Sequence, residues 1–189
     1  LAIAEFNGTK ITYRNINKTS KMKRLEKQRR HLERSISRKY EQNRRGNTFV
    51  KTNNIMRSEE RLRKMYARMT NIRTNYIHQT THDLVSLLPK RVVMEDLNVT
   101  GMMKNRHLSK AIQEQCFGEF IRQMQYKCEW NGIEFVQVDR FYPSSKTCSC
   151  CGAIKRDLRL MDRVYVCAEC GAEIDRDYNA AINLSRYVA

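Results

Sequence analysis

The sequence predicts an α/β fold in which a hairpin opens the chain and a long pair of basic helices precedes two parallel strands. The first observation is the order strand, helix, strand between residues 91 and 139, because such a crossover joins parallel neighbours. The second is the helical spacing of apolar residues from 21 to 88. Two Cys-x-x-Cys pairs near the C-terminus add an inserted metal-binding module.

The opening strands come from the runs LAIAEF and TKITYRNI, which are separated by Asn7-Gly8. Asparagine and glycine readily adopt the positive φ values that a tight two-residue turn requires. Both runs are rich in the apolar and β-branched residues that favour strands. We therefore expect an antiparallel hairpin at the start of the chain.

Two long helices should follow the hairpin. Residues 21–43 place their apolar side chains on one face, residues 44–47 interrupt the pattern, and a second stripe runs to Pro89. Such stripes favour an antiparallel pair that packs along a methionine-rich seam, and a ligand-binding role for the methionines is the weaker alternative. The two stripes are Met22, Leu25, Leu32, Ile36 and Tyr40, then Leu62, Met65, Met69, Ile72, Tyr76, Leu84, Leu87 and Leu88.

The parallel strands are expected after the helical pair. The run RVVMEDL, residues 91–97, is apolar and ends in two acids, as in a buried strand whose carboxyl end opens into a site. Residues 98–109 have the composition of a loop. A helix is expected over residues 110–130, where Asn131-Gly132 ends it, and IEFVQVD then forms the second strand.

The chain is strongly basic, with 36 lysines and arginines against 20 acids and a formal net charge of +16. This imbalance favours a polyanionic partner, with nucleic acid ahead of an anionic membrane surface. No apolar run approaches the ~20 residues of a membrane span, and the first residues lack the pattern of a secretory signal. The sequence therefore indicates a soluble intracellular protein.

Positive charge is concentrated on the first long helix, with eleven lysines and arginines against three glutamates between Lys21 and Arg45. A merely solvated face is the alternative, but an excess of this size favours a surface that follows a nucleic-acid backbone. The candidate contacts on this surface are Lys23, Lys27, Arg30, Arg34 and Arg38.

Cys148 and Cys151 form one Cys-x-x-Cys pair, and Cys167 and Cys170 form another after fifteen intervening residues. This spacing is typical of a structural zinc site, in which two knuckles point four thiolates at one tetrahedral ion. Disulfides or unliganded thiols fit less well with an intracellular chain that has seven cysteines. Cys150 could replace Cys151, although the chosen pair keeps both spacings regular. Because four thiolates close the coordination sphere, such a zinc ion supports structure and not chemistry.

Two groups of acids suggest a second metal site: Glu95 and Asp96 at the end of a strand, and Asp175 and Asp177 at the start of the last helix. Carboxylates are ligands that Mg²⁺ prefers, and two such ions can align a phosphodiester for hydrolysis. On spacing alone the ordinary alternative is stronger, because helix N-termini and strand ends often carry acids as caps or solvated charges.

Three segments in this order, VVMEDLNVTGM, FYPSSKTCSCCG and CAECGAEIDRDYNAAINL, resemble the TnpB family of transposon-encoded RNA-guided DNA nucleases, relatives of the type V CRISPR effectors. The resemblance implies a RuvC nuclease domain of RNase H-like fold with a zinc ribbon inserted before its final helix. It assigns residues 1–145 to the RuvC domain, with the basic helical pair inserted at 20–88. Residues 146–172 become the four-cysteine zinc ribbon and residues 173–189 the final RuvC helix.

By the same resemblance, Glu95 and Asp177 are catalytic carboxylates that bind Mg²⁺. Asp175 would cap and support the last helix, and Asn179 and Asn183 would fix that helix beside the site. The family's first catalytic aspartate is expected upstream of the first residue. The fold is then N-terminally truncated, and this fragment alone should show little or no cleavage.

The function that the resemblance implies is metal-dependent hydrolysis of DNA by the RuvC portion of an RNA-guided endonuclease of a mobile element. Structural Zn²⁺ and catalytic Mg²⁺ are the cofactors, guide RNA and target DNA are the partners, and no membrane association is expected. The place of action would be the prokaryotic cytoplasm, at the nucleoid. Two alternatives stay open: a nuclease-inactive, RNA-guided DNA-binding protein that acts as a repressor, and a DNA-joining transposase, which fits the ribbon less well.

Overall fold

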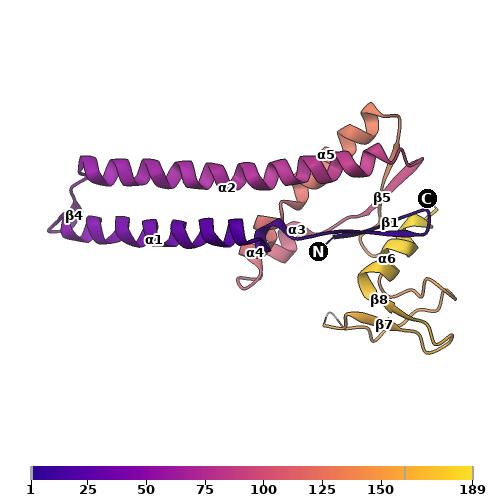
Figure 1. Cartoon of the computed structure of the whole chain (residues 1–189). Helices are drawn as coiled ribbons and strands as arrows, with labels where there is room; N and C mark the ends of the chain where they lie inside the picture. Colours follow the sequence, from indigo (N-terminus) through magenta and orange to yellow (C-terminus); the bar gives the residue numbers. More distant parts are fainter. Residues whose placement is uncertain (1, 160, 189) are drawn as a thin grey trace.

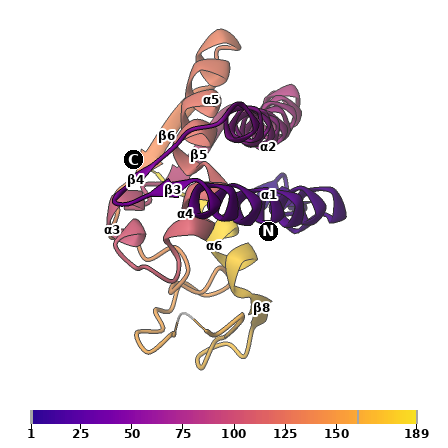
Figure 2. The same ribbon diagram turned by 90° about the vertical axis from the view of Figure 1, so that its left-hand side faces the viewer.

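The computed structural model describes residues 2–159 and 161–188, with residues 2–5 described by their backbone alone. Figure 1 shows a rod of two long helices, with β4 (Thr48–Phe49) at its tip, that projects from a body containing the shorter helices and the other labelled strands. The cysteine-bearing segment hangs from this body beside the last helix. Figure 2, which looks along the rod, places that segment on the side of the first long helix.

The chain opens with the predicted hairpin of β1 (Ala2–Phe6) and β2 (Thr9–Tyr13), whose strands are antiparallel. Asn7 and Gly8 form the turn with φ values of 50° and 79°. These values lie in the left-handed region, which asparagine and glycine tolerate better than other residues. The predicted hairpin is therefore confirmed.

The rod consists of α1 (Ser20–Gln42) and α2 (Asn53–Ser86), joined by a short hairpin of β3 (Arg44–Arg45) and β4 (Thr48–Phe49). Each long helix begins after a threonine whose side-chain oxygen accepts a hydrogen bond from the first turn. The two helices pack side by side, which confirms the predicted pair (Figure 1). No helix within the described residues is apolar over a length that would cross a bilayer.

The seam between α1 and α2 is apolar, as the two sequence stripes predict. Met22, Leu25 and Met69 are buried in it, and Met65 and Ile72 pack against them. Methionine side chains are flexible and fill irregular gaps between helices, which suits a seam of this length. The methionine stripe therefore serves packing.

The second stripe ends earlier than predicted. α2 stops at Ser86, Leu87 is exposed, and Leu88 is 70% exposed with a φ of 49°. Pro89 follows directly, and a proline ring disfavours the helical conformation in the residue before it. Leu87 and Leu88 consequently lie outside the seam.

A charged contact fastens the base of the rod to α4 (Ser109–Gln115). The ammonium group of Lys110 on α4 lies 2.6 Å from the carboxylate of Glu26 on α1. Hydrogen bonds from Arg29 and then Lys110 hold the pKa of Glu26 well below its usual range. The carboxylate is therefore ionised at neutral pH, and the contact is a charge-assisted hydrogen bond.

β5 (Arg91–Glu95) and β6 (Glu134–Val138) form the predicted parallel pair, with Glu95 opposite Val138 at the carboxyl ends. α5 (Phe117–Trp130) packs against β6 and α2. Every residue of β5 is half-buried, where the sequence predicts a buried strand, because β6 is its one neighbouring strand among the described residues. The core beneath the pair consists of Val85, Met124, Cys128 and Ile133.

Two helical boundaries differ from the prediction. A short helix, α3 (Val99–Met103), forms where the sequence predicts a loop, and the Asn98 side chain caps it by accepting a hydrogen bond from the Gly101 N–H at 2.9 Å. The single helix predicted over residues 110–130 is divided into α4 and α5. The division falls at Cys116, whose φ of 53° cannot continue an α-helix.

α6 (Arg176–Ser185) connects the two strand pairs. Within the described residues the β1–β2 hairpin and the β5–β6 pair are separate two-stranded sheets, where the prediction implies one sheet. α6 contacts both β1 and β5, and Arg91 donates a hydrogen bond to the backbone carbonyl of Tyr187 just beyond the helix. A two-stranded sheet is only marginally stable by itself, so both strand pairs depend on packing against this helix.

The seam of the rod should contribute strongly to stability. Met69 is 3% exposed within it, whereas Met56 on the same helix is 44% exposed. Met69→Ala removes buried contacts and should lower the free energy of unfolding by about 2–5 kcal/mol, whereas Met56→Ala should change it by less than about 0.5 kcal/mol. Urea unfolding followed by circular dichroism measures both variants, and equal midpoints would contradict this packing.

Candidate zinc ribbon and carboxylate site

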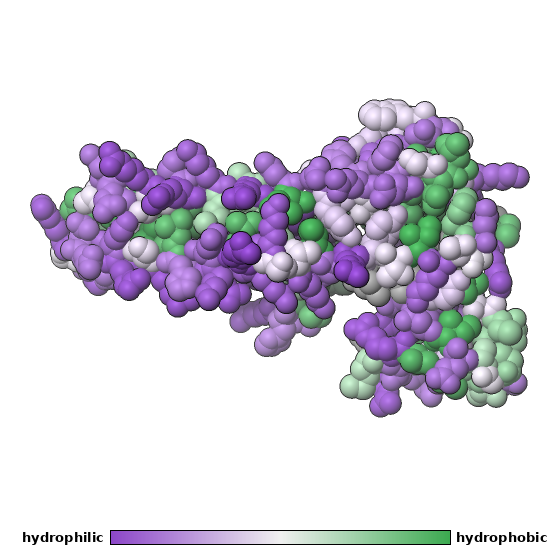
Figure 3. Space-filling view, in the orientation of Figure 1, coloured by the Kyte–Doolittle hydropathy of each residue, from purple (hydrophilic) through white to green (hydrophobic). Residues whose placement is uncertain are grey.

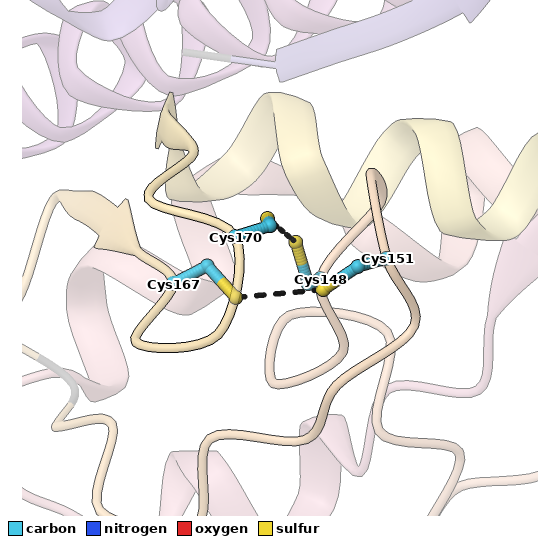
Figure 4. Close-up of side chains that lie close together, drawn as sticks. All are labelled: Cys148, Cys151, Cys167 and Cys170. Atoms are coloured by element: carbon cyan, nitrogen blue, oxygen red, sulfur yellow. Dashed lines mark hydrogen bonds between the residues drawn. The ribbon is translucent and has the colours of Figure 1, made fainter.

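The four predicted cysteine ligands converge on one point (Figure 4). The Sγ atoms of Cys148, Cys151, Cys167 and Cys170 all lie within 4.8 Å of one another. Cys148 Sγ is 3.7 Å from Cys170 Sγ, and Cys151 Sγ is 3.6 Å from Cys167 Sγ. A tetrahedral zinc ion with Zn–S bonds of about 2.3 Å separates its sulfurs by about 3.8 Å, so these side chains fit one zinc ion. Cys150 is exposed and does not belong to the group.

Each Cys-x-x-Cys pair is folded into a tight knuckle by its backbone. The Gly152 N–H donates to the Cys148 carbonyl at 2.9 Å, and the Gly171 N–H donates to the Cys167 carbonyl at 3.1 Å. Both glycines have positive φ, 79° and 71°, which other residues adopt only with strain. The Cys170 N–H also points at the Cys167 thiol and lowers the pKa of Cys167 to about 7.

β7 (Val164–Val166) and β8 (Glu173–Asp175) form the antiparallel hairpin of the ribbon. Tyr165 in the middle of β7 is 1% exposed and packs with Cys148 and Cys167. Burial, together with the neighbouring thiols, raises the pKa of Tyr165 to about 12. Tyr165 is not among the residues predicted from the sequence, although the alternation Val-Tyr-Val marks it as the inward residue of a strand.

β8 runs directly into α6 and so places two acids at the head of that helix. The strand ends at Asp175. Asp175 caps α6, because its Oδ1 accepts a hydrogen bond from the Tyr178 N–H at 2.9 Å. Asp177 lies in the first turn with 46% of its side chain exposed, 3.1 Å from the guanidinium of Arg176. The positive end of the helix dipole favours a carboxylate here.

Asn179 and Asn183 fasten α6 to the first knuckle and to the loop that leads into it. The Asn179 side chain accepts a hydrogen bond from the Ser149 N–H at 2.9 Å and donates one to the Thr147 carbonyl at 2.7 Å. Asn183 donates to the carbonyls of Ser144 and Thr147, both at 2.7 Å. Both asparagines are buried, and leaving such a group unpaired costs about 1–3 kcal/mol. These contacts hold the ribbon and α6 in one relative position.

Glu95 ends β5 at the carboxyl edge of the parallel pair. Its Oε1 accepts a hydrogen bond from the hydroxyl of Ser144, a residue that is 4% exposed. The neighbouring Asp96 pairs with Arg140 at 2.6 Å. Ser144 and Arg140 are not predicted from the sequence. They are polar loop residues, and nothing in the sequence around them indicates that the fold places them beside the end of β5.

The structure brings the two predicted catalytic acids onto adjoining elements, since α6, which carries Asp177, contacts β5, which carries Glu95. It does not join them with a third acid. Among the side chains that the structure describes, those of residues 6–159 and 161–188, the four cysteines are the one group of three or more candidate ligands gathered closely enough to share a metal ion. Two carboxylates are hard oxygen donors of the kind that suits Mg²⁺.

The five predicted cations form an exposed line along α1, spaced three or four residues apart. Figure 3 shows that the face of the rod turned toward the viewer is mostly hydrophilic. Arg30 lies 3.3 Å from Glu26, and the other four have no ion pair with a carboxylate of the described chain. Their charge is therefore available to a polyanion. The line consists of Lys23, Lys27, Arg30, Arg34 and Arg38.

Fold and site together define a basic α/β protein with a four-cysteine ribbon in front of its last helix. A family model described as the TNB domain of Cas12f1-like proteins matches residues 117–184, which include α5, β6 and the ribbon. The chain is similar to a candidate RNA-guided DNA endonuclease of Streptomyces pristinaespiralis, with 38% identity over 131 residues, 69% of this chain and 32% of that protein. It is also similar to a TnpB-like protein of Acanthamoeba polyphaga mimivirus, with 32% identity over 150 residues, 73% of this chain and 28% of that protein.

The fold also matches a solved structure of Cas12f1 in complex with sgRNA and target DNA. The TM-score is 0.58 at 19% identity, and the match covers 88% of this chain and 42% of that chain. These findings confirm the resemblance to the TnpB family, and the part of the chain that matches the model of the Cas12f1-like TNB domain is residues 117–184. The chain spans about a third of the length of the curated relatives that it matches.

The ribbon should depend on its metal. Cys167→Ser removes one thiolate from the cluster and should abolish stoichiometric zinc binding, whereas Cys150→Ser leaves all four ligands and should retain one zinc ion per chain. Plasma mass spectrometry measures the zinc content of the two variants. Limited proteolysis should cut residues 146–172 faster in Cys167→Ser, and equal zinc content and protection in both variants would contradict the site.

Proposed function

We propose that this chain is the RuvC nuclease portion, of RNase H-like fold, of an RNA-guided DNA endonuclease of a mobile element. One observation carries the proposal: Ser144 binds the carboxylate of Glu95, and Asn183 holds Ser144 against α6, whose first turn carries Asp177. These contacts connect the end of β5 with the start of α6. Both positions carry acids, in a chain that is otherwise strongly basic. The similarity to candidate RNA-guided DNA endonucleases supports the same activity.

Glu95 and Asp177 are the residues that would hold a catalytic Mg²⁺ ion. Such an ion, when bound, would supply Lewis-acid activation of the phosphodiester and of the attacking water. Ser144 fixes Oε1 of Glu95, and no hydrogen bond within the described residues reaches Oε2. Asp177 is presented from the first turn of α6, where the helix dipole favours negative charge. The zinc ribbon has the separate task of holding these elements together.

A third carboxylate from outside this sequence completes the site in our proposal, because the described acids supply only two. On this view the chain by itself cleaves little or no DNA. The same shortage favours one alternative function, an RNA-guided DNA-binding protein that holds its target without cutting. Cleavage assays on the complete protein separate the two.

Guide RNA and target DNA are the proposed partners, and the line of cations on α1 is their proposed contact surface. Cations on one helix face neutralise successive phosphates without reading sequence, so pairing with the guide would supply specificity. The matched Cas12f1 structure is a complex with sgRNA and target DNA, which supports these partners. A protein that acts on DNA in this way would work in the prokaryotic cytoplasm, at the nucleoid.

The nuclease proposal predicts Mg²⁺-dependent cleavage by the complete protein that contains this chain, loaded with guide RNA and given a matching DNA. Glu95→Gln and Asp177→Asn each remove a proposed metal ligand and should each lower the cleavage rate about 100-fold or more, because metal coordination supplies several kcal/mol of transition-state stabilisation. Gel analysis of end-labelled DNA measures the rates.

Glu129→Gln is the matched control, since Glu129 is exposed on α5 before the start of β6, at the opposite edge of the strand pair. It should cleave at the wild-type rate. Cleavage at the wild-type rate by either Glu95→Gln or Asp177→Asn would overturn the nuclease assignment. Guide-dependent DNA binding with no cleavage by the wild-type protein would favour the binding protein instead.

The cation line predicts a salt-dependent affinity for nucleic acid. Lys27→Ala combined with Arg34→Ala should weaken binding of an RNA–DNA heteroduplex and reduce the slope of log affinity against log salt by about 1–2. Lys64→Ala on α2 is the control, because Lys64 lies 3.7 Å from Glu60 and its charge is already partnered. Fluorescence anisotropy over a salt series measures the slopes, and the same slope in both variants would contradict this surface.

A further inference from the structure

We infer that Ser144 is a positioning residue that couples the orientation of the Glu95 carboxylate to the zinc ribbon. The inference rests on the proposed role of Glu95 as a metal ligand. It goes beyond that role because it assigns the positioning of Glu95 to a residue that is not itself a ligand. Three features of Ser144 carry it: its hydrogen bond to Glu95, its burial, and its place in the loop that leads into the first knuckle.

Ser144 is held from three directions. Its hydroxyl donates to Oε1 of Glu95, and its carbonyl accepts from the Asn183 side chain at 2.7 Å. Its N–H donates to the Tyr142 carbonyl at 2.8 Å. With 4% exposure, the residue has little room to rotate or to exchange its partners for water. A hydroxyl placed in this way determines where one oxygen of Glu95 lies.

The loop that carries Ser144 continues directly into the zinc knuckle. Within it, the N–H groups of Lys146 and Thr147 both donate to the Pro143 carbonyl at 3.0 Å, which closes a tight turn before Cys148. The Thr147 carbonyl accepts from both buried asparagines of α6. A displacement of the knuckle would therefore move Ser144, and with it the hydrogen bond to Glu95.

Glu95 sits at a strand end where its side chain would otherwise have several rotamers. A hydrogen bond to Oε1 removes most of that freedom and leaves Oε2 for a cation. Metal sites tolerate errors of only about 0.5 Å, and loss of a partner that orients a ligand typically costs 10–100-fold in metal affinity. Ser144 should therefore strengthen cation binding without touching the cation.

The neighbouring Ser145 provides a matched control. It has the same side chain and is half-buried, but no hydrogen bond in the described chain connects its hydroxyl to Glu95. Ser144→Ala and Ser145→Ala remove the same atom from adjacent positions in one loop. A difference between them reports the contact with Glu95 and not a general loss of loop polarity.

The test measures binding of Mn²⁺ alone, as a probe for Mg²⁺, to the complete zinc-loaded protein by electron paramagnetic resonance. Ser144→Ala should weaken Mn²⁺ binding 10–100-fold relative to the wild type, with one zinc ion still bound per chain. Ser145→Ala should bind Mn²⁺ as the wild type does. Ser144→Thr, which keeps the hydroxyl, should recover most of the affinity.

Glu95→Gln separates this inference from the proposed function. If Glu95→Gln loses Mn²⁺ binding while Ser144→Ala binds as tightly as the wild type, the positioning role is overturned and the function of Glu95 stands. Unchanged Mn²⁺ binding by Glu95→Gln overturns both. Loss of zinc from Ser144→Ala would reveal a purely structural role and would also overturn the inference.

Discussion

The buried carboxamides of Asn179 and Asn183 are the contacts on which the remaining organisation depends. They form four hydrogen bonds with the backbone of the first knuckle and of the loop before it, and thereby join a helix, a metal ribbon and a strand end. A carboxamide can donate and accept at once, which lets a single side chain bind a backbone N–H and a carbonyl. Because both groups are shielded from water, replacing either contact by a water molecule is costly. The ribbon, Glu95 and Asp177 are held as one unit for this reason.

The rod obeys a different constraint. Its helices are too polar to be stable in isolation, and they depend on one narrow apolar seam between them. The remaining faces carry charged residues. The contact between Lys110 and Glu26 fixes the base of the rod to the body that carries the candidate site. An exposed line of cations is consequently held in a defined direction relative to Glu95. The proposed contact with a nucleic acid requires such a fixed arrangement.

Features that depend on neighbours in the sequence were predictable. The Asn7-Gly8 turn, the helical seam and the cysteine spacing each carry a local signal, and the structure confirms them. The break at Cys116 was not predictable, because a cysteine, unlike asparagine or glycine, seldom adopts positive φ and carries no local signal for it. Ser144 was missed for a related reason: its partner Glu95 lies 49 residues away, and only the fold brings the two together. The catalytic roles proposed for the acids rest on family resemblance, since acids at helix and strand ends have common structural uses.

The coupling of ribbon and carboxylates is measured most directly by anomalous X-ray scattering from crystals of the complete protein soaked in Mn²⁺. Data collected at the zinc and manganese absorption edges locate the two metals separately. We expect a zinc peak among the four cysteines and a manganese peak in contact with both Glu95 and Asp177, with the Ser144 hydroxyl on the other oxygen of Glu95. A manganese peak remote from both carboxylates, in crystals with zinc in the ribbon, would contradict the proposal that these two acids share a metal ion.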